Sequence, residues 1–134
     1  MRGKCHCGEV EYELISELKE VYCCNCKDCQ VLSGSGYHLL GIVDRESINV
    51  VSGALVAYRN PTESGYEMTR NFCPTCGTPV YIESTRFRDI SMLLVSTLEN
   101  PEIKKPSFEI WTKSKYSWAD NQCNLRSYEC GACD

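Results

Sequence analysis

Hydrophobic and polar residues alternate along most of this chain, with the period of two that is typical of strands with one buried face. The alternation is clearest at 9–14, where Val10, Tyr12 and Leu14 are separated by glutamates. Further short segments rich in apolar, β-branched and aromatic residues predict additional strands, at 37–43, 47–53, 55–60, 66–72, 79–82, 89–98 and 107–111. The segment 89–98 is long enough to be one strand or two strands with a bend.

One helix is predicted, at 26–34, where the sequence CKDCQVLSG provides about two turns that end at Gly34. The strands at 66–72 and 79–82 are expected to form a hairpin, because a turn-forming CPTCG segment lies between them. The chain contains no internal repeat, low-complexity run or linker. We therefore expect a single mainly β domain over residues 1–134, with 122–134 as a flexible cysteine-containing tail.

Composition and charge narrow the classes of partner. Hydrophobic residues make up 43% of the 134 residues and charged residues 24%, which is typical of a folded soluble protein. The net charge of −4 gives no basic surface, so neither nucleic acid nor a membrane is an expected partner. No apolar run approaches the roughly 18 residues of a membrane span, and the first residues lack the apolar segment of a secretory signal. The expected compartment is the cytoplasm.

The chain has 11 cysteines, and an odd number cannot all form internal disulfides. In a reducing compartment, thiols stay free or bind metal. The pair CPTCG at 73–77 places two thiols on one side of a tight turn followed by glycine. In CHCG at 5–8, which has the same trailing glycine, Cys5 and Cys7 of an extended segment face the same way and His6 faces the other. Together the two pairs supply the tetrahedral sulfur set of a structural zinc ion, from Cys5, Cys7, Cys73 and Cys76. The alternative is incidental buried cysteines beside a redox-active CxxC pair, although the helix-start context of such a pair is missing.

A middle cluster, CCNCKDC at 23–29, supplies three converging thiols. Cys24 and Cys26 share one side of an extended segment, and a helical turn returns Cys29 to the same point, whereas Cys23 faces the other way. Three thiolates with one open position are typical of a catalytic zinc ion. Two alternatives stay open: the site holds no ion, or a further cysteine closes it, with Cys23, Cys123, Cys130 and Cys133 as the candidates.

The ligand type indicates which chemistry an open site would favour. A zinc ion with three thiolates carries one net negative charge, so it is a weaker Lewis acid than zinc held by three neutral histidines. Its open position suits a soft ligand such as a thiol, which binds as an electron-rich thiolate that can attack a carbonyl carbon. The middle cluster therefore favours formation or cleavage of a carbon–sulfur bond over hydrolysis.

Five segments resemble, in order and spacing, the glutathione-dependent formaldehyde-activating enzyme family, also called the CENP-V/GFA domain. These are GKCHCGEVEYEL, CNCKDCQVLSGSGYHL, RNFCPTCGTPVY, STLENPE and FEIWTKSKYSWA, and the resemblance covers roughly residues 3–129. It implies an Mss4-like fold of small antiparallel sheets pinned by zinc. It also implies two zinc ions per chain, a structural one at Cys5, Cys7, Cys73 and Cys76 and a catalytic one at Cys24, Cys26 and Cys29.

The activity that this resemblance implies is the addition of glutathione to formaldehyde, giving S-hydroxymethylglutathione, which is carbon–sulfur lyase chemistry by class. The expected partners are thus a small thiol and a small aldehyde. The rival hypothesis is a zinc-binding module without catalytic activity that docks to another protein. The sequence leaves the physiological substrate and the oligomeric state undefined.

Several residues outside the cysteine clusters are secondary candidates. His38 is a possible proton donor or a structural histidine of its strand, and Lys27 either attracts a substrate carboxylate or is an ordinary surface residue. The segment 33–35 offers backbone donors or simply ends the helix. Three aromatic residues are expected in the core or beside the site: Trp111, Tyr116 and Trp118.

Overall fold

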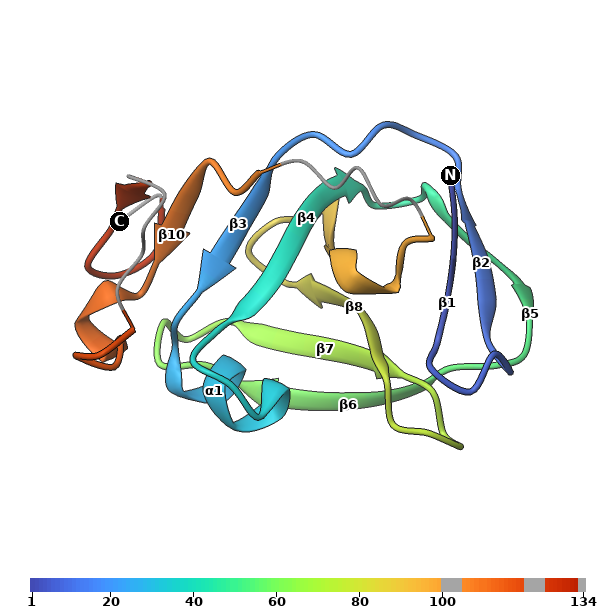
Figure 1. Cartoon of the computed structure of the whole chain (residues 1–134), viewed down its shortest axis with the longest axis horizontal. Coiled ribbons are helices and arrows are strands. Elements are labelled where there is room, and N and C mark those ends of the chain that lie inside the picture. Colours follow the sequence, from blue (N-terminus) through green and yellow to red (C-terminus); the bar gives the residue numbers. More distant parts are fainter. Residues whose placement is uncertain (100–104, 120–124, 133–134) are drawn as a thin grey trace. The chain divides into compact units, whose positions relative to one another are not determined.

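Strands dominate the computed structural model, which describes residues 1–99, 105–119 and 125–132. The chain forms two compact units that interleave along the sequence. The first consists of Met1–Lys19 and Gly41–Ile103, and the second of Glu20–Leu40 and Lys104–Asp134. Figure 1 shows the elements of both units, coloured along the sequence. No helix in the described residues has the length and apolar character needed to cross a membrane.

The first unit begins with a three-stranded antiparallel sheet. Its order is β1-β2-β5, with β1 at Arg2–Lys4, β2 at Glu11–Leu14 and β5 at Ile48–Ser52. Along β2 the glutamates are exposed, while Tyr12 and Leu14 are buried. The period-two pattern therefore identified both the strand and its buried face.

The remaining strands of the first unit form an antiparallel arrangement in the order β9-β8-β7-β6. They comprise β6 (Val56–Pro61), β7 (Glu67–Phe72), β8 (Pro79–Ser84) and β9 (Ile90–Leu94). After β9 the backbone turns into the short 3-10 helix η1, Val95–Thr97, so the segment 89–98 is a strand followed by a bend. The predicted hairpin is present as β7 and β8, which run side by side in Figure 1.

Close packing joins η1 to the three-stranded sheet. The hydroxyls of Tyr12 and Thr97 lie 2.6 Å apart in a buried hydrogen bond. Gly3 forms an isolated antiparallel bridge with Leu98, and a Cβ placed on Gly3 would lie 2.2 Å from the Tyr12 ring. Only glycine therefore allows the β1 backbone to pass this close to the buried ring.

The second unit contains β3 (Val21–Cys24), α1 (Lys27–Ser33), β10 (Phe108–Ile110), the 3-10 helix η2 (Thr112–Ser114) and β11 (Arg126–Ser127). The strand β4, His38–Asp44, begins in the second unit and ends in the first. β10 pairs in parallel with β3 and with β11. On the β3–β10 pair the rings of Tyr22 and Phe108 stack with centroids 4.9 Å apart.

The mainly β class is confirmed by the order of elements, in which strands dominate. The predicted helix is also confirmed, and α1 ends at Gly34, which has the left-handed conformation at φ 65°. Strands were found in every predicted segment, but β1, β3 and β11 were not predicted. The parallel pairs of the second unit also differ from the antiparallel sheets that were expected. β3 and β10 are separated by most of the chain, so no hairpin turn forces them to run in opposite directions.

Candidate metal centres

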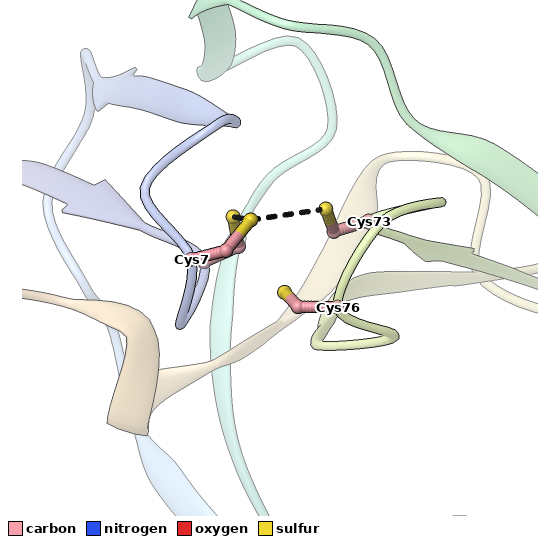
Figure 2. A group of neighbouring side chains, drawn as sticks. Cys7, Cys73 and Cys76 are labelled. Carbon is pink, nitrogen blue, oxygen red and sulfur yellow. Dashed lines mark hydrogen bonds between the residues drawn. The ribbon is translucent and has the colours of Figure 1, made fainter.

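Four of the predicted ligands converge in the first unit. Cys5 and Cys7 follow β1, Cys73 and Cys76 follow β7, and their four sulfur atoms all lie within 4.8 Å of one another. The Cys7 sulfur lies 3.5 Å from that of Cys5 and 3.9 Å from that of Cys73. In Figure 2 Cys7 faces Cys73 and Cys76 from the opposite loop. Tetrahedral zinc, with bonds of about 2.3 Å, separates its sulfur ligands by about 3.8 Å, so the spacing fits this ion.

Glycines make both cysteine turns possible. Gly8 and Gly77 have φ values of 81° and 78°, a backbone conformation that residues other than glycine rarely adopt. The Gly8 N–H donates to the Cys5 carbonyl at 3.1 Å, and the Gly77 N–H donates to the Cys73 carbonyl at 2.9 Å. The first turn is closed across three residues and the second across four, and each loop points two thiols at the other.

Hydrogen bonds distribute charge unequally among these thiols. Burial opposes ionisation of Cys5, but the Val10 N–H donates to its sulfur at 3.3 Å and, with the thiols of Cys7 and Cys73, lowers the pKa of Cys5. The Thr78 hydroxyl, 3.1 Å from the Cys76 sulfur, is the main cause that lowers the pKa of Cys76 to about 5. The Glu9 amide favours ionisation of Cys7, but burial and the other thiols raise the pKa of Cys7 to about 12. Full ionisation of the four thiols thus requires a cation, and their sulfur donor set suits zinc.

The second group lies in the second unit and consists of three cysteines. Cys24 ends β3, Cys26 is the N-cap residue of α1, and Cys29 lies in the first helical turn. Their sulfur atoms lie within 4.8 Å of one another, and the Cys29 N–H donates to the Cys26 sulfur at 3.3 Å. The helical turn therefore returns Cys29 to the other two thiols, as the spacing predicted. Cys24 and Cys29 are buried, whereas Cys26 is half-buried.

The electrostatics of this group also favour a bound cation. Hydrogen bonds with the sulfurs of Cys26 and Cys29, together with burial, raise the pKa of Cys24 well above its ordinary value. Three neighbouring thiols in a largely buried position cannot all become anionic unless a positive charge offsets their repulsion. A divalent ion that prefers sulfur provides that charge, so both cysteine groups could hold metal ions.

A buried polar network supports the three-cysteine group. Asn25, between two of its cysteines, is 2% exposed and donates through its amide to the Ile110 carbonyl at 2.9 Å and to the Glu109 carboxylate at 3.3 Å. Glu109 is also 2% exposed and forms an ion pair with Lys115 at 3.1 Å. The Gln30 amide of α1 donates to the Asn25 carbonyl at 2.9 Å. These bonds fix the backbone between Cys24 and Cys26.

This network was missed by the sequence reasoning. A glutamate inside the otherwise apolar segment FEIW was the available signal, because a charged residue on a short central strand needs a buried partner. The identity of that partner depends on the parallel register of β3 and β10, in which Glu109 lies opposite Cys23. No local pattern predicts such a pairing between distant segments.

The remaining candidates have different positions. Cys23 is buried but lies outside the three-cysteine group, as its alternation along the strand predicted. Cys130 also lies outside it, and its carbonyl accepts a hydrogen bond from the Trp111 N–H at 2.9 Å. Cys123 and Cys133 are outside the described residues. His38 is the first residue of β4 and is buried.

Fold and site together define a small, mainly β protein with two separate cysteine clusters that could each hold a metal ion. Comparison with known families identifies one of them. The sequence model of the glutathione-dependent formaldehyde-activating enzyme family matches residues 1–114, which is most of the chain. The chain belongs to this family.

Individual relatives agree with this membership. A protein of Penicillium rubens, provisionally named a glutathione-dependent formaldehyde-activating enzyme, is 26% identical over 110 residues, covering 78% of this chain and 56% of the relative. A protein of the same provisional name from Fusarium vanettenii is 25% identical over 81 residues, covering 60% of this chain and 42% of the relative. The chain thus spans about half the length of these curated relatives.

A solved structure supports the fold. The crystal structure of a Rhodobacter sphaeroides protein superposes with a TM-score of 0.61 and 28% sequence identity. The superposition covers 75% of this chain and 92% of that one. The fold of the covered part of the chain is therefore shared with an experimentally determined protein.

Proposed function

We propose that this protein joins glutathione, or a similar thiol, to formaldehyde and forms S-hydroxymethylglutathione, with a zinc ion held by Cys24, Cys26 and Cys29. The observation that carries the proposal is the convergence of these three sulfur atoms within 4.8 Å, in a group that among the described residues contains three cysteines and not four. Family membership supports the choice of thiol and aldehyde.

The reaction is an addition in which all atoms are retained. The sulfur of the thiol attacks the carbonyl carbon of formaldehyde, one carbon–sulfur bond forms, and the carbon–oxygen double bond becomes single. The proton that leaves the thiol ends on the former carbonyl oxygen, giving a hydroxymethyl thioether. A zinc ion at the three-cysteine group would supply stabilisation of the substrate sulfur as a thiolate at neutral pH.

The protein's own residues have two tasks in this proposal. Cys24, Cys26 and Cys29 hold the ion, and the network of Asn25 and Glu109 keeps their segment in place. The four-cysteine group, Cys5, Cys7, Cys73 and Cys76, would hold a second zinc ion whose ligands are complete and whose role is structural.

The test is the rate of adduct formation between glutathione and formaldehyde, followed by NMR exchange against the uncatalysed background. The zinc-loaded protein should accelerate the reaction, and Cys26→Ser should abolish the acceleration while circular dichroism shows an intact fold. Cys23→Ala is the matched control, because Cys23 is a buried neighbour outside the group and its loss should leave most of the acceleration in place.

The same measurement separates the enzyme from a zinc module that only binds another protein. Equal rates with the wild-type protein and with Cys26→Ser, using glutathione and other small thiols, would reject the proposal. Native mass spectrometry adds a second criterion, since the enzyme should carry two zinc ions and an exchangeable thiol adduct.

A further inference from the structure

Two large aromatic side chains of the second unit are exposed beside the three-cysteine segment. Trp118 is 73% exposed and Tyr116 is 41% exposed. Their rings stack with centroids 5.3 Å apart and planes inclined by 13°. Leaving so much ring surface in water forgoes the stabilisation of burial, and adjacent exposed aromatic rings are typical of binding surfaces.

A cation from the cysteine segment reaches this ring pair. Lys27 lies between Cys26 and Cys29 in the sequence, and its ammonium nitrogen is 5.7 Å from the centroid of the Tyr116 ring. The Tyr116 ring is therefore within reach of a side chain whose backbone directly follows the proposed ligand Cys26.

The backbone holds the rings close to α1. The Gln30 side chain donates to the Ser114 carbonyl at 2.8 Å, which attaches the helix to the segment that precedes Tyr116. A Cβ on Gly36 would lie 3.8 Å from the Tyr116 ring, so the backbone after the helix passes directly beside it. The ring pair and the lysine are thus held in a defined arrangement within one unit.

We propose that Lys27, Tyr116 and Trp118 form a subsite for the peptide part of the thiol substrate, and this inference rests on the function proposed above. A peptide-like thiol such as glutathione carries carboxylates, which an ammonium group binds, and flat amide groups, which pack on exposed aromatic rings. A small thiol without these groups gains nothing from the subsite. The three residues therefore select a carboxylate-bearing peptide thiol.

Tryptophan fluorescence can test the subsite without any reaction. The chain has two tryptophans, so Trp111→Phe leaves Trp118 as the single reporter. S-methylglutathione is the probe, because its blocked sulfur cannot add to formaldehyde while its carboxylates and amides are intact. It should change Trp118 fluorescence in a saturable way, and Lys27→Met in the same background should weaken the apparent affinity about three- to fivefold, as expected for an exposed charge pair.

A matched control exists on the same unit. Lys113 is an exposed lysine that plays no part in the proposed subsite, and its partner ring at 5.0 Å, Trp111, is replaced by phenylalanine in the reporter background, so the control matches the loss of one lysine charge. Lys113→Met in the reporter background should leave the affinity for S-methylglutathione unchanged. The diethyl ester of the probe, which has no free carboxylate, should bind as weakly to the reporter protein as the acid binds to Lys27→Met.

Three results would overturn the inference. The first is a Trp118 signal that does not respond to the probe, and the second is equal affinity for the acid and the ester. The third is a signal that follows protein concentration and not probe, because the rings would then form an interface between copies. Turnover of glutathione without a Trp118 response would refute the subsite and leave the proposed function standing. Probe binding without turnover would support the subsite and refute the proposed function.

Discussion

At the residue scale, the segment that carries the three-cysteine group is held by polar neighbours outside the cysteine group. The Glu109 carboxylate accepts hydrogen bonds from Asn25 and from Ser127, at 3.3 Å each, and pairs with Lys115. A carboxylate that is 2% exposed is stable only because all these donors surround it. The cysteine spacing could be seen in the sequence, but this support could not.

Glu109→Gln should therefore weaken both the fold and the three-cysteine group. The neutral amide removes the negative charge that pairs with Lys115 and replaces the oxygen that accepts from Ser127 by an NH2 donor, so we expect a loss of about 1–3 kcal/mol in the free energy of unfolding. Affinity for cobalt at the three-cysteine group, read from the cobalt–thiolate absorption, should fall as well. Glu83→Gln breaks the half-exposed ion pair with Arg45 and serves as control, with an expected loss of about 1 kcal/mol or less and unchanged cobalt affinity. Equal cobalt affinity in the wild type and Glu109→Gln would refute the support role.

Gly77 tests the local geometry of the four-cysteine group. Alanine at φ 78° is strained by about 1–2 kcal/mol, although nothing lies within 4 Å of the new Cβ. Gly65, at φ 85° and equally open, provides the same strain away from the cysteines. Both alanine variants should unfold at lower denaturant concentration, but only Gly77→Ala should weaken metal binding in a chelator competition. Equal metal affinity in the two variants would show that the turn does not position the thiols.

At the scale of elements, the sequence pattern predicted the longer strands and missed one fully buried strand and two very short ones. In β3 all four residues are buried, so Val21–Cys24 shows no alternation and its cysteines resemble only a ligand motif. β1 and β11 span 3 and 2 residues, too few for a period to appear. The parallel pairing of β10 was also beyond reach, because it depends on contacts between distant segments.

The contact between β1 and the buried ring of β2 gives an element-scale prediction. Gly3→Ala places a Cβ 2.2 Å from the Tyr12 ring, so the ring or the strand must move at a cost of about 1–3 kcal/mol or more. Gly36→Ala is the control, since its Cβ would meet Tyr116 at an ordinary 3.8 Å. In denaturant unfolding, the free energy of unfolding of Gly3→Ala should be well below that of Gly36→Ala. The reverse order would mean that the three-stranded sheet is packed differently.

At the scale of the whole molecule, the two cysteine groups close loops of very different length. The four-cysteine group links residues 5–7 to residues 73–76, whereas the three-cysteine group lies entirely within 24–29. A metal bond that closes a long loop removes more conformational entropy from the unfolded chain. Both groups were predicted from cysteine spacing, because each contributing motif is a short stretch of sequence. This holds for the four-cysteine group too, although its two motifs lie far apart along the chain.

Removing one ligand from each group should separate their roles. Cys76→Ser should lose one metal ion and lower the melting temperature by about 10 °C or more, since structural zinc binding contributes directly to folding. Cys26→Ser should also lose one ion but lower the melting temperature by less than about 5 °C, because its loop is short. Native mass spectrometry counts the ions and calorimetry gives the temperatures. A larger thermal loss for Cys26→Ser than for Cys76→Ser would contradict this division.

The central claim is that the three-cysteine group holds an ion with one position free for a substrate thiol. Anomalous scattering at the zinc edge, from crystals grown with glutathione, tests it most directly. The account predicts zinc at both cysteine groups, with the glutathione sulfur as fourth ligand beside Cys24, Cys26 and Cys29. A fourth ligand from the protein itself, or no zinc at this group, would contradict it.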